Sequence, residues 1–142
     1  MQYSIKLTGD GKEIFFGAAD DDKGIIKSVE IYLDTIDDAV RSKSDAMLSR
    51  IKIVGKIQEN TSQRLIDVFN WSLEMSSEKI YKKLEIGIYN SEKILRQYIF
   101  PEMFVVDYKE VYTADGHDKD EKPYFELYLT QKENNLKAID TF

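Results

Sequence analysis

Ser62-Gln63-Arg64-Leu65-Ile66-Asp67-Val68-Phe69-Asn70-Trp71-Ser72-Leu73-Glu74-Met75 is the stretch, residues 62–75, that decides how the chain is interpreted. Its apolar residues return with the 3.6-residue period of an α-helix. Asn60, Thr61 and Ser62 are candidate N-terminal caps directly before it. We therefore predict one helix over 62–75, and the segments on either side of it follow the period of two that is typical of strands.

The predicted helix has two apolar faces. The first face consists of Leu65, Ile66, Phe69 and Leu73, and the second consists of Val68, Trp71 and Met75. A helix on the outside of a single sheet needs only one apolar stripe, so the second indicates another layer or another subunit. We expect Val68, Trp71 and Met75 to lie at a subunit interface. The alternative is a helix sandwiched within its own domain.

Alternating apolar and polar residues predict several strands before the helix. They indicate a hairpin over 5–16 that turns at Gly9-Asp10-Gly11, a half-buried strand around Val29, Ile31 and Leu33, and a strand over 48–57 with a bulge at Gly55. A turn at residues 20–24 separates the first hairpin from the next strand.

The same alternation predicts strands after the helix. We expect an antiparallel pair over 84–89 and 94–100, an interruption at Pro101 at a strand edge or corner, and a long hairpin over 104–112 and 124–131. The total is about seven or eight strands and one helix, without βαβ alternation. This indicates one domain over 1–142, mainly β (α+β), as a small β-barrel or sandwich with one flanking α-helix. Closure as a small barrel, with the helix over an open end or one flank, is the simplest arrangement.

Residues 35–47 are polar and rich in serine and aspartate, with too few apolar residues to build much core. We therefore expect a long loop, and long loops within compact domains are uncommon and tend to be functional or flexible. It is the best candidate for an extended arm that contacts a partner, with Asp37, Asp38, Val40 and Arg41 as interface residues. A short helix over 36–41 is the alternative.

Composition excludes several kinds of function. The chain has no cysteine, which removes disulfides, thiolate metal sites and cysteine nucleophiles. Its formal net charge is −6 with scattered Lys and Arg, so nucleic acid is not an expected partner. The first residues lack the features of a signal peptide and no stretch reaches the length of a membrane span, so we expect cytoplasmic assembly without membrane insertion.

His117 is the single histidine and lies among acidic residues at 115–122. Neither this segment nor residues 20–24 has the ligand spacing of an EF-hand. A serine triad would have to use His117 without any nucleophile-elbow glycine pattern. We therefore expect no catalytic, cofactor-binding or metal-binding residues and predict that the protein is not an enzyme.

Residues 48 to about 140 resemble the tube-forming proteins of contractile injection machines, which include phage tail-tube proteins and the haemolysin-coregulated protein of type VI secretion. The resemblance lies in the order and character of the elements, which are a strand at Arg50–Ile57, a lone helix with Leu65–Trp71, strands at 84–89, 94–100 and 104–108, and a closing strand at Phe125–Gln131.

This resemblance implies a small β-barrel that assembles into hexameric rings, which stack into a tube around a β-lined channel. It also implies that residues 35–47 reach the neighbouring ring, that the second helix stripe meets an adjacent subunit, and that neighbours pair the exposed edge strands.

Our leading hypothesis is a structural ring subunit of the inner tube of a phage-tail-like injection or secretion apparatus. Expected partners are copies of the chain itself, with sheath, baseplate or cargo proteins as further candidates, in a virion or a released particle. The alternative is a non-catalytic β-barrel binding domain, monomeric or dimeric, with its ligand in the barrel mouth.

Overall fold

The computed structural model describes residues 1–35, 47–114, 122–132 and 140–142. The described elements are β1 (Gln2–Gly9), β2 (Lys12–Phe16), the 3-10 helix η1 (Asp20–Asp22), β3 (Ile26–Thr35), β4 (Met47–Lys56), the 3-10 helix η3 (Glu59–Thr61), α2 (Ser62–Ser72), β5 (Lys82–Asn90), β6 (Lys93–Val111), β7 (Tyr124–Gln131) and β8 (Asp140–Thr141). The predicted class, mainly β with one α-helix, is confirmed for these residues. The proposed arm residues Asp37, Asp38, Val40 and Arg41, and also His117, lie outside them.

All described strands form one antiparallel sheet in the order β2-β1-β5-β6-β7-β4-β3, with β8 paired to β6. The predicted hairpins β1–β2, β5–β6 and β6–β7 are present. Asp10 and Gly11 both have positive φ, as the type I′ form of a two-residue hairpin turn requires. The sheet is not closed, because β2 and β3 are its two ends, and the architecture is therefore an open sandwich.

The strand β6 divides the sheet into two layers. Its first part, up to Met103, pairs with β5, and its second part, from Met103, pairs with β7. The prediction of two separate strands around Pro101 was wrong. Between Phe100 and Met103 the register with β5 shifts, so Pro101 lies at an irregularity where β6 bends without ending.

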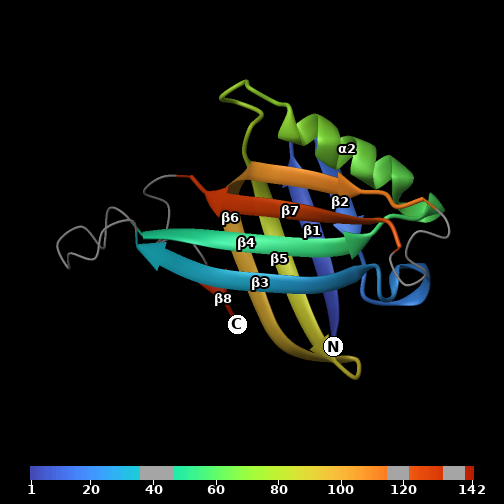
Figure 1. The fold of residues 1–142 in the computed structure, drawn as a ribbon. Coiled ribbons are helices and arrows are strands. Elements are labelled where there is room, and N and C mark those ends of the chain that lie inside the picture. Colours follow the sequence, from blue (N-terminus) through green and yellow to red (C-terminus); the bar gives the residue numbers. More distant parts are fainter. Residues whose placement is uncertain (36–46, 115–121, 133–139) are drawn as a thin grey trace.

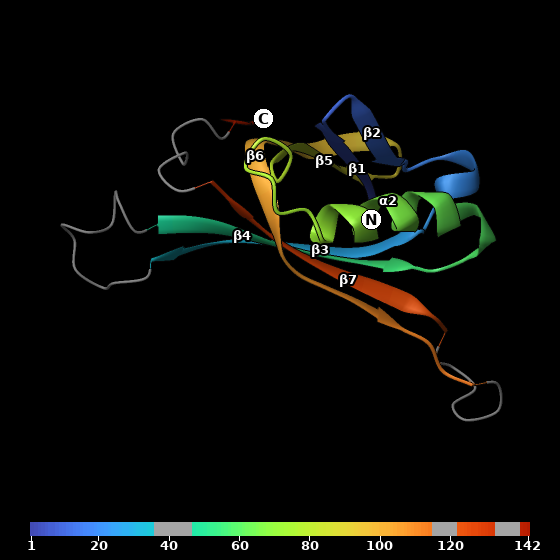
Figure 2. The same ribbon diagram turned by 90° about the horizontal axis from the view of Figure 1, so that it is seen from above.

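We call β3, β4, β7 and residues 103–111 of β6 the front layer, and β1, β2, β5 and residues 93–103 of β6 the back layer. Figure 1 shows the front strands running across the back strands, and Figure 2 shows the two layers facing each other. Sandwiches with crossing strands form corners where one strand passes from layer to layer, as β6 does here. Helix α2 covers one end of the space between the layers.

The core lies between the two layers and under α2. The buried apolar residues of the core are Ile5, Leu7, Ile14, Phe16, Ile25, Ile26, Ile51, Ile53, Leu65, Val68, Trp71, Leu84, Ile86, Phe100, Met103, Phe125, Leu127 and Leu129. Those in β1, β2, β4, β5 and β7 confirm the alternation predicted for the strands. At one end of the β4–β7 pair, buried Gln131 accepts hydrogen bonds from the backbone N–H and the hydroxyl of Ser49. The Thr130 hydroxyl donates to the carbonyl of Ser49 over 2.8 Å.

The bulge predicted at Gly55 lies on the opposite strand. Ile26 pairs with Gly55 and Ser28 pairs with Val54, so the extra residue is Lys27 in β3. A Cβ at position 55 would lie 2.5 Å from ring atoms of Phe125. Gly55 therefore makes room for a buried aromatic ring on the neighbouring strand, a role that the sequence pattern did not reveal.

Candidate assembly surfaces

Helix α2 contributes one face to the core. Leu65, Val68 and Trp71 are buried, and the indole N–H of Trp71 donates a hydrogen bond of 2.8 Å to the carbonyl of Ile80. The expectation that Val68 and Trp71 lie at a subunit interface was therefore wrong, because the helix directs them into the space between the chain's own layers. Sequence periodicity identified two stripes but could not tell which one faces inward.

The predicted helix is also too long. It ends at Ser72, where the backbone N–H of Leu73 bonds to the carbonyl of Asn70 and the Ser72 hydroxyl bonds to the carbonyl of Phe69. Met75 follows the helix and is 92% exposed. That Met75 lies at a subunit interface stays a prediction.

The other apolar face of the helix region is exposed. Ile66, Phe69 and Leu73 are 49%, 48% and 63% exposed, and we call them the helix stripe. The Phe69 ring meets Tyr108 of β6 edge to face, with 6.3 Å between ring centroids. Beside this contact lies a hollow of about 220 Å³ between α2 and the end of β6, lined by Ile57, Ser62, Leu65, Ile66, Phe69, Glu110 and Tyr112.

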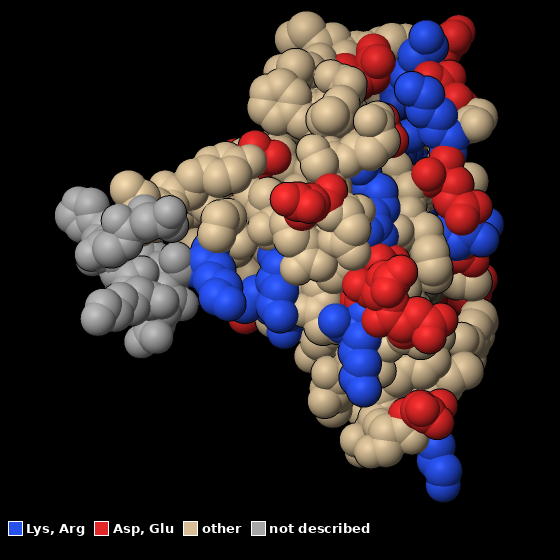
Figure 3. Space-filling model, turned by 90° about the vertical axis from the view of Figure 1, so that its right-hand side faces the viewer, with Lys and Arg blue, Asp and Glu red and all other residues tan. Residues whose placement is uncertain are grey.

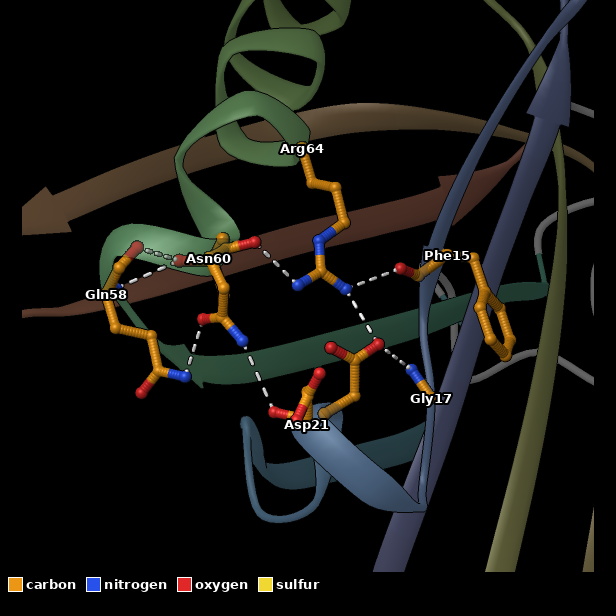
Figure 4. Close-up of polar contacts among 8 residues, drawn as sticks. Phe15, Gly17, Asp21, Gln58, Asn60 and Arg64 are labelled. Carbon is orange, nitrogen blue, oxygen red and sulfur yellow. Dashed lines mark hydrogen bonds and ion pairs between the residues drawn. The ribbon is translucent and has the colours of Figure 1, made fainter.

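The N-terminal end of α2 is tied to the back layer by Arg64 (Figure 4). Its guanidinium donates to the carbonyl of Phe15 and to the Asp22 carboxylate, both over 2.8 Å, and to the carbonyl of Asn60 over 2.9 Å. The Asp22 carboxylate also accepts a bond of 2.9 Å from the backbone N–H of Gly17.

These contacts change the acidity of Asp22. Burial by itself raises the pKa of this carboxyl, but the hydrogen bonds from Arg64 and Gly17 and the positive charge of Arg64 outweigh burial and lower the pKa below its ordinary value. The carboxylate is therefore held in its charged form, and the orientation of α2 over the layers is maintained by a partly buried ion pair.

The front layer has two unpaired strand edges among the described residues. One is β3, which is 10 residues long and pairs only with β4. The other is residues 104–111 of β6, which pair with β7 on one side, while β5 pairs with β6 only as far as Met103. In the back layer, by contrast, the end strand β2 has only 5 residues, and β8 partly covers the β6 side by pairing with Tyr98 and Ile99. Long unpaired edges are sites where another chain can add a strand.

The outward face of the front layer is polar and mixed in charge. Lys52 and Lys109 both approach Glu126, at 4.0 and 3.9 Å, and the Tyr128 hydroxyl donates to Glu126 over 2.8 Å. This hydrogen bond is the main reason why the pKa of Tyr128 lies above its ordinary value. Next to these groups lies a shallow hollow of about 220 Å³, lined by Glu30, Tyr32, Arg50, Ile51, Lys52, Val106, Asp107, Tyr128 and Leu129.

The surface turned to the viewer in Figure 3 shows the same intermingling of basic and acidic side chains, without a large area of one sign. Within the described ranges there is no group of three or more His, Cys, Asp and Glu side chains that could hold a metal ion. Of the helical segments described, none has the length and apolar character needed to cross a membrane.

Comparisons with known proteins bear on the fold. No protein-family model matches the sequence, and no curated protein matches it. Among solved structures, the chain is similar to Hcp1 from Flavobacterium johnsoniae, with 16% identity, a TM-score of 0.60, and coverage of 99% of this chain and 94% of that one. Hcp1 from Salmonella typhimurium gives 13% identity and a TM-score of 0.60 over 92% of this chain and 83% of that one.

A chain of the sheath–tube complex of the extracellular contractile injection system PVC, in its extended state, is also similar, with 14% identity and a TM-score of 0.58 over 99% of this chain and 88% of that one. The architecture defined above, an open β-sandwich with one helix over its end, is therefore that of a class of tube proteins. The chain has the fold of the Hcp1 and phage-tail-like tube subunits, and the resemblance noted in the sequence is confirmed at the level of the fold.

Proposed function

We propose that this protein is a structural subunit whose copies form rings, and that the rings stack into the inner tube of a phage-tail-like injection or secretion apparatus. The observation that carries the proposal is the fold, which matches tube-subunit structures over nearly the whole chain. The two long unpaired edges of the front layer support it, because they provide the surfaces through which copies can join.

The strand directions of the front layer fit a closed ring. Each neighbouring pair in the order β6, β7, β4, β3 is antiparallel, so the directions alternate. Rotation about a ring axis keeps the direction of each strand along that axis. The β3 edge of one copy therefore meets the β6 edge of the next copy antiparallel, and the alternation continues around the ring. Such a head-to-tail contact closes if the rotation closes, and the resemblance to tube proteins implies six copies.

In this ring the outward face of the front layer lines the channel. Its acidic and basic groups, including Glu30, Arg50, Lys52, Asp107 and Glu126, are of both signs, which gives passing cargo no strongly attractive field. A subunit of this kind acts through its surfaces and requires no catalytic residues. Sheath, baseplate and cargo proteins are the partners that we propose beyond other copies of the chain.

The alternative of a binding domain with a ligand in a barrel mouth requires a closed barrel, and the described residues do not form one. The sheet is open, α2 covers the end of the space between the layers, and Leu65, Val68 and Trp71 fill that end. The tube subunit is therefore the function that the geometry supports best.

Electron microscopy and light scattering of the purified protein test the proposal. We expect rings whose amount rises with protein concentration, because edge pairing is a contact between two copies. At higher concentration we expect the rings to stack. A protein that stays monomeric at every concentration up to the solubility limit would contradict it.

A pair of proline substitutions tests the edge itself. Backbone N–H groups of successive strand residues point to opposite sides, so one of Glu30 and Ile31 donates toward β4 and the other toward the free edge of β3. Glu30→Pro and Ile31→Pro should therefore differ, with one variant destabilised and the other folded but unable to form rings. Ring formation by both variants would exclude β3 as the joining edge.

A further inference from the structure

The helix stripe and β3 have exposed apolar side chains on the same side of the front layer. Phe69 contacts Tyr108, and the Tyr108 ring lies 6.4 Å from that of Phe125, which is buried in the core. The helix stripe is therefore on the inward side of the layer, next to the unpaired edge of β6.

A second apolar row lies at the opposite edge of the same layer. Val29, Ile31 and Leu33 alternate along β3 with the outward-facing Glu30 and Tyr32. Val29 and Ile31 pack partly against the core, but Leu33 is 58% exposed although it pairs with the buried Ser49. The inward row of β3 therefore extends past the point where the chain's own core covers it.

We infer that the helix stripe of one copy packs on the inward row of β3 of the next copy, forming an apolar contact behind each edge-to-edge strand junction. This inference rests on the proposed ring. When the β6 edge of one copy meets the β3 edge of another, the stripe beside β6 and the row on β3 lie on the same side of the joined sheet. The occupant is a second copy of this chain, because the complementary surface is present at the opposite edge of the same layer.

The chemistry of the two surfaces agrees with this pairing. Both surfaces are apolar, with Ile66, Phe69 and Leu73 on the first and Ile31 and Leu33 on the second. Each surface flanks a strand edge that no other described strand pairs with. Strand pairing aligns the copies through hydrogen bonds, and the apolar contact removes exposed carbon surface from water.

Charge substitutions on each surface test the inference. Ile66→Lys and Leu33→Glu should each leave a folded monomer, judged by circular dichroism and thermal unfolding, and should lower the amount of protein in rings by about tenfold or more. The control is Ile94→Lys, because Ile94 is also an exposed apolar residue but lies in the back layer. It should form rings as the unmodified protein does.

Combining Ile66→Lys with Leu33→Glu places opposite charges at the contact and should restore part of the ring population. Rings of normal abundance in both single variants, or equal loss in the Ile94→Lys control, would overturn the inference and leave the proposed function intact. Absence of rings in the unmodified protein would instead overturn the proposed function. If one single variant fails to fold, the other tests the same contact from the opposite surface.

Discussion

At the residue scale, the ion pair of Asp22 with Arg64 predicts a pH-dependent stability. The pKa of Asp22 is lowered in the folded state, so the pair stabilises the fold fully above the unfolded pKa of about 3.9 and loses this effect as the pH falls through the lower, folded value. Asp22→Asn should reduce the free energy of unfolding by about 1–2 kcal/mol at pH 7.

Urea denaturation at neutral and acidic pH measures this effect. The difference between the Asp22→Asn variant and the unmodified protein should shrink as the pH falls from about 4 through the lower, folded pKa of Asp22, because the carboxyl becomes protonated first in the unfolded chain and then in the folded one. Asp21→Asn is the control, since Asp21 meets Asn60 through its backbone carbonyl and not through its carboxylate. A pH-independent difference would show that Asp22 acts through packing alone.

The second residue-scale prediction concerns Gly55. In Gly55→Ala the new methyl group would lie 2.5 Å from the Phe125 ring and 3.2 Å from the carbonyl oxygen of Ile25, so the buried ring must move. We expect a loss of about 1–3 kcal/mol in the free energy of unfolding. Phe125→Leu in the same chain should remove most of the clash, and a double-mutant cycle by chemical denaturation measures this coupling. Additive effects would contradict the steric explanation.

At the element scale, α2 presents one apolar face to the core and another to the surface, and substitutions should distinguish them. Val68→Asp buries a charge without a partner and should cost at least about 4 kcal/mol, a large part of the roughly 5–15 kcal/mol by which a domain is stable. Ile66→Asp, two residues earlier and half exposed, should change stability by less than about 1 kcal/mol. Circular dichroism with thermal unfolding checks both, and equal effects would reverse the assignment of the faces.

The elements show which features a sequence pattern can predict. The strands at 84–89 and 124–131 and the turn at Asp10-Gly11 were predictable because period-two alternation and positive-φ residues are local properties. The continuity of β6 through Pro101 was not, because β5 and β7 pair with its two parts and hold the bend together. Likewise, Gly55 is explained only by Phe125, which is seventy residues away along the chain.

At the scale of the whole molecule, the segment between β3 and β4 predicts a separation of ring formation from stacking. Thr35 pairs with Met47, so a two-residue Asn-Gly turn in place of 36–46 keeps the β3–β4 register. If this segment is the arm that we propose, the shortened chain should form single rings but no stacked tubes by electron microscopy. The control for the loss of charge is a full-length variant in which Asp37 and Asp38 are changed to Asn. Tubes of normal length from the shortened chain would exclude an arm in this segment.

The sequence by itself determined the fold class of this protein. Local periodicity and turn residues are properties of short segments, so they were enough to predict a mainly β chain with one helix, and the order of these elements resembles that of tube proteins. The tertiary structure alone decided which stripe of α2 is core, that the sheet stays open, and that β3 and the second part of β6 are long unpaired edges of one layer. These features depend on contacts between residues far apart in the chain, because burial of a side chain is set by what packs against it and not by its neighbours in sequence.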